Sequence, residues 1–283
     1  MTSKPGNALS TLIIGFDSAW SERNRGAIVA VVRESDGAIR EAGLPKLVNF
    51  DEAAQTIDEW KVHYQPDSTV VMIDQPIIVR NATGQRPVEQ IASSSVGKRR
   101  GGMQPANTRK TALFGPAAPV FRFLERFGGP GNPLEPVEDM CVLETYPVLA
   151  IIALGWIVED ESTNGRLPKY NPKRKKTFSA ADWHMLCTRA AEEFTSLGLA
   201  HMEQWLLELS SRRLPNKSDQ DCLDACLCLL AGLYFCSGHR CLVVGDYETG
   251  YIVVPASDTL YAELRDRCER LGRTPHDWIR LLG

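Results

Sequence analysis

Two runs of consecutive apolar residues each end in an aspartate, and they constrain the fold more than any other part of the chain. Leu12–Phe16 leads into Asp17, and Val70–Ile73 leads into Asp74. Unbroken apolar runs are typical of strands that are buried on both faces of a sheet. The segment 51–64 between them has helical periodicity, so the two runs are predicted to be parallel strands of one sheet. If they are neighbours, both aspartates emerge at the carboxyl edge, where open α/β sheets bind ligands.

The remaining elements extend this sheet into a single α/β domain over residues 1–283. Further strands are predicted at 26–34, 38–48 and 140–147, and the Asp-Gly pair at 36–37 predicts that the first two form an antiparallel hairpin. The predicted core consists of strands within about 11–77 and 140–147, a late core helix at 219–236 and an extra hairpin at 239–255. Helical and loop insertions are predicted at about 79–135 and 155–212, with helices at 117–127, 179–197 and 200–212. Other helices are expected from Pro147, from 258 and at the terminus, whereas 79–116 has no clear periodicity and predicts a long loop.

Composition narrows the class of protein. The hydrophobic content of 43% is ample for a large core and excludes global disorder. A net charge of −3 argues against a basic protein that coats nucleic acid, but it leaves a local basic groove open. The N-terminal residues have no apolar signal core, and the longest apolar run carries Asp224 and is too short for a bilayer. Eight cysteines without C-x-x-C spacing are typical of reduced thiols, so we expect a soluble, cytoplasmic protein with no membrane partner.

Three further acids extend the pattern. Glu144 follows the apolar residues Cys141–Leu143, as Asp17 and Asp74 follow their runs. Asp221 and Asp224 are three residues apart and therefore share one face of the helix at 219–236. Asp221 has an alternative role in a capping box with Ser218. Asp224 lies a turn inside an apolar helix, where an unpaired carboxylate costs several kcal/mol, so it requires a metal or a basic partner.

These acids predict a divalent metal site. Carboxylate oxygens are the ligands that Mg²⁺ and Mn²⁺ prefer, and two such ions can activate a water and stabilise the departing oxygen of a phosphodiester. The candidate catalytic residues are Asp17, Asp74, Glu144, Asp221 and Asp224. The candidate metal ligands are Asp17, Asp74, Glu144 and Asp224.

Basic clusters supply candidate contacts with nucleic acid, because lysine and arginine bind phosphates. The alternative is that they lie in solvated loops that balance an acidic body. Tyr170 and Trp183 are candidates for stacking on bases, with core packing as the favoured alternative. Zinc binding by the cysteines at 222, 226 and 228 is disfavoured, because they do not share one helix face. The clustered basic candidates are Lys98, Arg99, Arg100, Arg109, Lys110, Lys173, Arg174, Lys175 and Lys176.

Five motifs in order resemble those of the domain-of-unknown-function 429 family, which is regarded as predicted nucleases of the ribonuclease H-like fold. They are "GFDSAW", "IDQPI" with "NATGQRPVE", "ETYP", "DQDCLDA" and "GYIVVP", and the resemblance covers about residues 12 to 255. It implies a mixed, five-stranded central sheet flanked by helices, with the first three strands antiparallel and the fourth parallel to the first. It implies that Asp17, Asp74, Glu144, Asp221 and Asp224 surround a metal-dependent centre. It also draws Asn81, Gly84, Arg86 and Glu89 toward the rim of the site, and Arg86 joins the candidate contacts with nucleic acid.

Three functions stay open from the sequence. The leading hypothesis is a metal-dependent nuclease that uses Mg²⁺ or Mn²⁺, and the second is a catalytically inactive nucleic-acid-binding protein of the same fold. The third is a nucleotide-dependent phosphotransferase like actin and the sugar kinases. Those enzymes follow their strand aspartates with glycine-rich turns, whereas Asp17 precedes Ser-Ala-Trp and Asp74 precedes Gln-Pro-Ile. The sequence does not distinguish DNA from RNA or endonuclease from exonuclease, and it leaves the oligomeric state open, with a dimer as one option.

Overall fold

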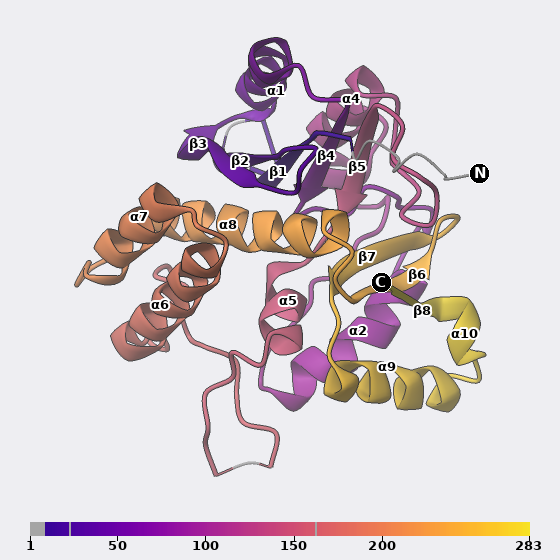
Figure 1. Cartoon of the computed structure of the whole chain (residues 1–283). Helices are drawn as coiled ribbons and strands as arrows, with labels where there is room; N and C mark the ends of the chain where they lie inside the picture. Colours follow the sequence, from indigo (N-terminus) through magenta and orange to yellow (C-terminus); the bar gives the residue numbers. More distant parts are fainter. Residues whose placement is uncertain (1–8, 23, 162) are drawn as a thin grey trace, which may run out of the picture.

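A five-stranded mixed sheet organises the first half of the chain (Figure 1). The structure is a computed structural model and describes residues 9–22, 24–161 and 163–283. The sheet has the order β3-β2-β1-β4-β5. β1 pairs antiparallel with β2, as does β2 with β3, whereas β4 is parallel to both β1 and β5. The predicted parallel pairing of the first and fourth strands is therefore confirmed. The strands are β1 (Thr11–Asp17), β2 (Gly26–Arg33), β3 (Ile39–Val48), β4 (Ser68–Ile73) and β5 (Met140–Glu144).

Strand register brings the acids to one edge of this sheet. Phe16 of β1 lies opposite Ile73 of β4, and Ile73 lies opposite Glu144 of β5. The pairing continues past the strand end, because the Asp74 N–H donates to the Phe16 carbonyl at 2.9 Å. Asp17 and Asp74 therefore lie at the same level at the ends of two adjacent parallel strands, and Glu144 lies one residue earlier in register on the next strand.

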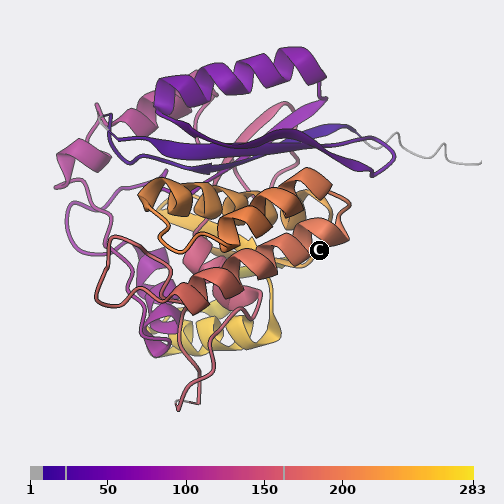
Figure 2. The same cartoon turned by 90° about the vertical axis from the view of Figure 1, so that its left-hand side faces the viewer.

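Helices cover both faces of the sheet (Figures 1 and 2). Successive residues of a strand point to opposite faces, so Leu12, Ile14 and Phe16 pack in one core, and Ile13 packs in the other. The first core is covered by α1 (Phe50–Tyr64) and α4 (Pro119–Arg126). The second core is covered by α8 (Lys217–Cys236), beside which lie α6 (Ala180–Ser196) and α7 (Ala200–Ser210).

Two glycines allow α8 to lie directly on the sheet. A Cβ atom on Gly15 of β1 would be 2.1 Å from the Ala225 carbonyl oxygen, and one on Gly232 would be 2.8 Å from Ile13 Cγ2. A larger side chain at position 15 would collide with the backbone of α8, and one at position 232 would require the side chains of Ile13 and Met72 to shift. The close approach carries the first turns of α8 to the carboxyl end of β1.

The predicted helix cap of α8 is wrong in detail. Asn216 is the N-cap, and its side chain accepts from the Asp219 N–H while the Asp219 carboxylate accepts from the Asn216 N–H. The capping box therefore uses Asn216 and Asp219, because the helix begins at Lys217 rather than at 219. Asp221, which was predicted to form this box with Ser218, is left for another contact.

A second, three-stranded sheet of order β7-β6-β8 is formed by the C-terminal part of the chain. The predicted hairpin is confirmed as β6 (Cys241–Asp246) and β7 (Gly250–Pro255), and β8 (Ile279–Leu282) adds a strand that was not predicted. The stretch predicted as a long loop holds two helices, which corrects that prediction. The helices not yet given are α2 (Pro87–Lys98), α3 (Thr111–Phe114), α5 (Pro147–Ala153), α9 (Asp258–Arg270) and α10 (Pro275–Trp278). Within the described residues, no helix has both the length and the apolar character needed to cross a membrane.

Candidate active site

A cavity of about 650 Å³ lies at the carboxyl edge of β1, β4 and β5. All five acids that the sequence singled out line it: Asp17, Asp74, Glu144, Asp221 and Asp224. Residues from positions 17 to 224 therefore meet in one space because strand register and the close packing of α8 bring them there. Its volume is within the range of about 300–1,000 Å³ that is typical of small-ligand sites.

The four aspartates, called the aspartate cluster from here on, repel one another inside the protein. Asp17 and Asp224 are only 6% and 5% exposed. Burial raises the pKa of Asp17 well above its usual range, and the charges of Asp224 and Asp74 raise it further. Burial and then Asp224 do the same to the pKa of Asp74. Burial raises the pKa of Asp224 to about 6, although Lys217 and a hydrogen bond from Tyr170 oppose the shift.

Compensation for these charges is partial. Tyr170 Oη donates to Asp224 Oδ1 at 2.9 Å, and Gln220 Nε2 donates to Asp224 Oδ2 at 3.1 Å. Lys217 forms an ion pair with Asp221, one helical turn away. Among the described residues, no donor forms a hydrogen bond with the carboxylate of Asp17 or Asp74. One lysine therefore faces four acids, and two of the acids have no direct partner.

Glu144 belongs to a different group, the arginine network of Arg86, Glu89 and Glu144. Arg86 Nη1 donates to Glu144 Oε2 at 2.8 Å, and Arg86 Nη2 donates to Glu144 Oε1 at 2.5 Å. The Ile77 N–H also donates to Glu144 Oε2, at 3.1 Å. Both oxygens of Glu144 are thus occupied by protein donors, so we leave Glu144 out of the proposed metal ligands.

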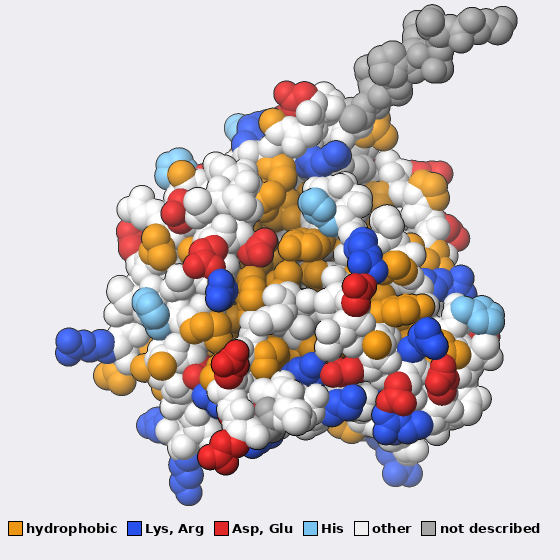
Figure 3. Space-filling model, turned by 60° about the horizontal axis from the view of Figure 1, so that its bottom comes forward, with side chains coloured by type: hydrophobic (Ala, Val, Ile, Leu, Met, Phe, Trp, Pro, Cys, Tyr) orange, Lys and Arg blue, Asp and Glu red, His pale blue; other side chains and the backbone are white. Residues whose placement is uncertain are grey.

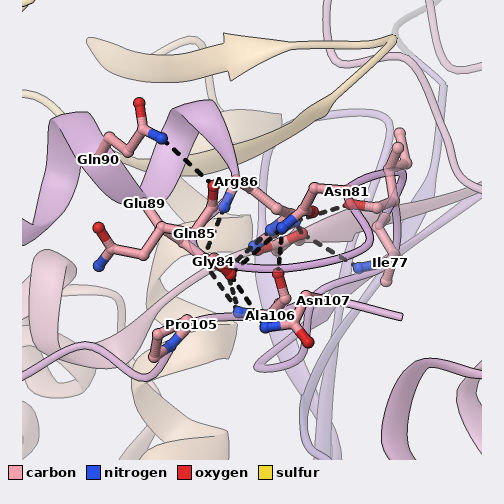
Figure 4. A network of polar contacts seen from close by, with 12 residues as sticks. Ile77, Asn81, Gly84, Gln85, Arg86, Glu89, Gln90, Pro105, Ala106 and Asn107 are labelled. Carbon is pink, nitrogen blue, oxygen red and sulfur yellow. Dashed lines mark hydrogen bonds and ion pairs between the residues drawn. The ribbon is translucent and has the colours of Figure 1, made fainter. Parts of the chain in front are cut away.

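The same arginine links Glu89 to the network (Figure 4). Arg86 Nε donates to Glu89 Oε1 at 2.8 Å, and the Ala106 N–H donates to both Glu89 oxygens at 3.1 and 3.0 Å. Asn81 Nδ2 in turn donates to the carbonyls of Ala106 and Gly84. These residues hold the loops on either side of α2 against the sheet. Arg86 has 0% exposure, so the expectation that it contacts nucleic acid is corrected.

The predicted basic residues separate into three groups. Arg100, Lys173 and Arg174 line the cavity, together with the unpredicted Arg25 and Lys169. Arg99 is corrected as a surface contact, because it is 5% exposed and donates to both oxygens of Glu263, each at 2.9 Å. The face in Figure 3 mixes basic with acidic side chains rather than gathering a basic band. The predicted residues that do not line the cavity are Lys98, Arg109, Lys110, Lys175 and Lys176.

Aromatic residues at the site were only partly foreseen. Trp183 is fully buried and its Nε1 donates to the Leu209 carbonyl at 3.1 Å, which confirms core packing rather than stacking on bases. Trp20 lines the cavity and was missed, as was Tyr146. Trp20 Nε1 donates to the Asp74 carbonyl at 2.9 Å, and its φ of +56° is unusual for a bulky residue. Lys217 was also missed, although its position four residues before Asp221 is the spacing of a helical ion pair.

The donors of the aspartate cluster fit a hard divalent ion by their chemistry, since all are carboxylate oxygens. In the described part of the chain, however, no group of three His, Cys, Asp or Glu side chains is already arranged around one point as metal ligands. The eight cysteines are free thiols, and those at 222, 226 and 228 are buried among apolar residues. An ion that binds at the aspartate cluster would therefore have to draw the carboxylates closer together.

Comparisons with known proteins give one match. The model of a family described as protein of unknown function (DUF429) matches residues 15–249. No curated protein and no solved structure matches the chain.

Proposed function

The chain belongs to this family, DUF429, and on that premise we propose that it is a metal-dependent nuclease that hydrolyses phosphodiester bonds of nucleic acid. The observation that carries the proposal concerns the carboxylates of Asp17 and Asp74. Both line the cavity, and neither accepts a hydrogen bond from any residue that the structure describes. Burying several carboxylates together is costly unless cations compensate, and the single positive charge of Lys217 does not balance four carboxylates. A strand order with two parallel and two antiparallel neighbours also agrees with the ribonuclease H-like fold, which we include in the proposal.

Asp17, Asp74 and Asp224 are the residues that would hold Mg²⁺ or Mn²⁺. Such ions, when bound, lower the pKa of a water and stabilise the charge on a leaving oxygen. The protein supplies orientation: Tyr170 and Gln220 fix the carboxylate of Asp224. The Gln220 Oε1 atom is buried and has no hydrogen-bond partner among the described residues, so it can accept a hydrogen bond from a bound water or substrate.

Lys217 has a defined part in this proposal. Burial lowers the pKa of its ammonium group, but the charges of Asp224 and Asp17 outweigh burial and raise it above the usual value. The lysine is thus held charged at the place where a cation is needed. In the metal-free protein it is a partial substitute for the ion.

Hydrolysis assays test the proposal directly. We expect the full chain with Mn²⁺ or Mg²⁺ to cleave single-stranded DNA, RNA or bis(4-nitrophenyl) phosphate. The variants Asp17→Asn, Asp74→Asn and Asp224→Asn should each lose at least about a hundredfold in rate, because each removes several kcal/mol of charge stabilisation. Asp139→Asn is the control, since Asp139 is an exposed acid that does not line the cavity.

Two outcomes would overturn the proposal. If all three variants cleave as fast as the parent, the aspartate cluster is not the catalytic centre. If the parent binds Mn²⁺ and nucleic acid but cleaves none of the substrates, the chain is the non-catalytic binder that the sequence left open.

A further inference from the structure

One wall of the cavity is built from two loops that hydrogen bonds join to each other. The Leu167 N–H donates to the Arg99 carbonyl, and Lys169 Nζ donates to the Arg100 carbonyl, each at 3.0 Å. Tyr146 Oη, at the end of β5, donates to the Gly102 carbonyl at 3.2 Å. These contacts join the loop after α2 to the loop before α6. The acids therefore lie in a cavity of which these joined loops form one side.

The size of the pocket limits what can reach the acids. Its volume of about 650 Å³ is that of a site for one small organic ligand. One or two nucleotides are of this size. A turn of double helix is far larger, because a single major groove is already wide enough to admit an α-helix. A segment of intact duplex is therefore larger than this cavity, whereas one or two nucleotides of a single strand match its volume.

Cations are concentrated on this wall. Arg100, Lys169, Lys173 and Arg174 all line the pocket. In the part of the chain that the structure describes, neither Lys173 nor Arg174 has an acidic partner within ion-pair distance. Burial lowers the pKa of Lys169, and the charges of Arg166 and Arg174 lower it further. Arg100 Nη1 forms an ion pair with Asp160 Oδ2 at 3.2 Å, so the positive charge left without an acidic partner on this wall includes that of Lys173 and Arg174. Such a surplus of positive charge is the electrostatic condition for an anion site.

The backbone at Arg100 is unfavourable for any residue except glycine. Arg100 follows the end of α2 with a φ of +57°, in the left-handed position where helices usually place glycine. Of the three non-glycine residues with positive φ among those described, Arg100 and Trp20 line the pocket. A long cationic side chain is kept there despite the conformational cost, which indicates a use for it.

We propose that Arg100, Lys169, Lys173 and Arg174 bind a phosphate group of a nucleotide that enters the pocket. The substrate is then a single-stranded end of nucleic acid or a free nucleotide, and an intact duplex is excluded. This inference rests on the proposed function for the reaction at the acids, but the phosphate site itself is separate from them. On a single-stranded end, Asp17 and Asp74 act on one phosphate while the wall holds its neighbour.

Calorimetric titrations of the full chain test this inference. The probes are adenosine 5′-monophosphate, adenosine, a 5′-phosphorylated tetrathymidylate and a blunt 20-base-pair duplex. We expect the monophosphate and the tetrathymidylate to bind and adenosine to bind at least about tenfold more weakly, because a charged hydrogen bond to phosphate is lost. Equal binding by the two phosphorylated probes indicates a nucleic-acid end, and preference for the monophosphate indicates a free nucleotide.

Arg100→Gly and Arg174→Gln are the decisive variants. Arg100→Gly removes the cation and relieves the left-handed backbone, so a loss of binding is not explained by unfolding. Each variant should weaken binding of the monophosphate at least about tenfold. The matched control is Lys175→Gln with Lys176→Gln, which removes two cations from the same loop that do not line the pocket, and it should change binding less than about twofold.

The outcomes separate this inference from the proposed function. It is overturned if the monophosphate binds no better than adenosine, if the control loses as much as the pocket variants, or if the duplex binds as tightly as the single strand. Metal-dependent hydrolysis of bis(4-nitrophenyl) phosphate that persists beside such a result leaves the proposed function intact. Phosphate binding without any hydrolysis supports the inference and counts against the proposed function.

Discussion

Two groups of acids line the cavity at the carboxyl edge of the sheet, and they differ in the hydrogen-bond donors that the protein supplies to them. In the arginine network, the guanidinium of Arg86 donates to both Glu89 and Glu144, and backbone N–H groups donate to the remaining oxygen positions. In the aspartate cluster, Asp17 and Asp74 face other acids, and the charge of Lys217 acts on both of them.

This difference distinguishes an acid that stabilises the fold from one that is available for chemistry. A carboxylate whose oxygens accept from the protein has no use for an added cation. A buried carboxylate without a donor raises the free energy of the folded state until a cation arrives. Neighbouring position on a sheet edge therefore does not imply a shared role, and Glu144 is better understood as a residue that positions the loop after Asp74.

The largest expected effect comes from breaking the arginine network. Arg86→Leu leaves Glu89 and Glu144 buried without their cation, and it should lower the free energy of unfolding by about 3–5 kcal/mol. Urea denaturation of the variant and the parent measures this loss. Arg126→Leu is the control, because Arg126 forms an exposed pair with Asp58 and should cost no more than about 1 kcal/mol. Equal losses in the two variants would mean that the network does not stabilise the fold.

In the aspartate cluster, a substitution is expected to raise the free energy of unfolding, and by a somewhat smaller amount. The pKa of Asp224 is raised to about 6 in the folded protein, so the folded state holds a proton that the unfolded state has lost between pH 4 and pH 6. Stability of the metal-free protein therefore falls as the pH rises through this window. Asp224→Asn should match the parent near pH 4 and exceed its free energy of unfolding by up to about 3 kcal/mol at pH 7.5.

Asp182 is the control for this direction of change, because the protein lowers the pKa of its carboxyl group instead of raising it. Burial raises its pKa, but hydrogen bonds from Arg166, the Lys169 N–H and Ser179 outweigh burial and lower it overall. Its stabilisation is present at neutral pH and is lost as the pH falls, so Asp182→Asn should be less stable than the parent at pH 7.5. Urea titrations with a chelator at both pH values measure the two variants, and a less stable Asp224→Asn at pH 7.5 would contradict the repulsion.

The smallest expected effect is the stabilisation of the folded protein by Mn²⁺, which should depend on the aspartate cluster and not on the arginine network. Mn²⁺ at a hundred times its dissociation constant should stabilise the parent by about 2.7 kcal/mol at pH 7.5. Asp17→Asn should be more stable than the metal-free parent, because it removes a carboxylate that burial and Asp224 disfavour, but it should lose most of this gain. Glu144→Gln should be less stable without metal and still keep the gain. Thermal unfolding with and without Mn²⁺ measures both, and loss of the gain in Glu144→Gln would return Glu144 to the ligands.

Much of the sheet was predictable because its strands are continuous apolar runs. The parallel pairing of the first and fourth strands was deduced from two such runs joined by a helical segment, and the buried nature of α8 was deduced from its own apolar sequence. Helix α2 was missed because its sequence, "PVEQIASSSVGK", contains three serines in a row and little contrast between its faces. Strand β8 was missed because four residues are too few to show a period.

The candidate site was predictable in its acids but not in their partners. Asp17, Asp74 and Asp224 were identifiable because each is a charge where the surrounding pattern is apolar. Arg86 and Arg99 belong to polar stretches, and nothing in those stretches indicates that their side chains turn inward to Glu144 and Glu263. Burial of an ion pair depends on packing between distant segments, which a single sequence does not display.

The contact of α8 with Gly15 also means that the aspartate cluster forms late, because its two elements are far apart in the chain. β1 is synthesised first and α8 more than two hundred residues later, and N-terminal segments generally fold first as a chain is made. A nascent chain that ends before residue 217 has Asp17 and Asp74 but lacks Asp221 and Asp224. The aspartate cluster is therefore complete only after α8 has been synthesised and has packed against Gly15 of β1. A chain that is still being synthesised does not yet contain the assembled site.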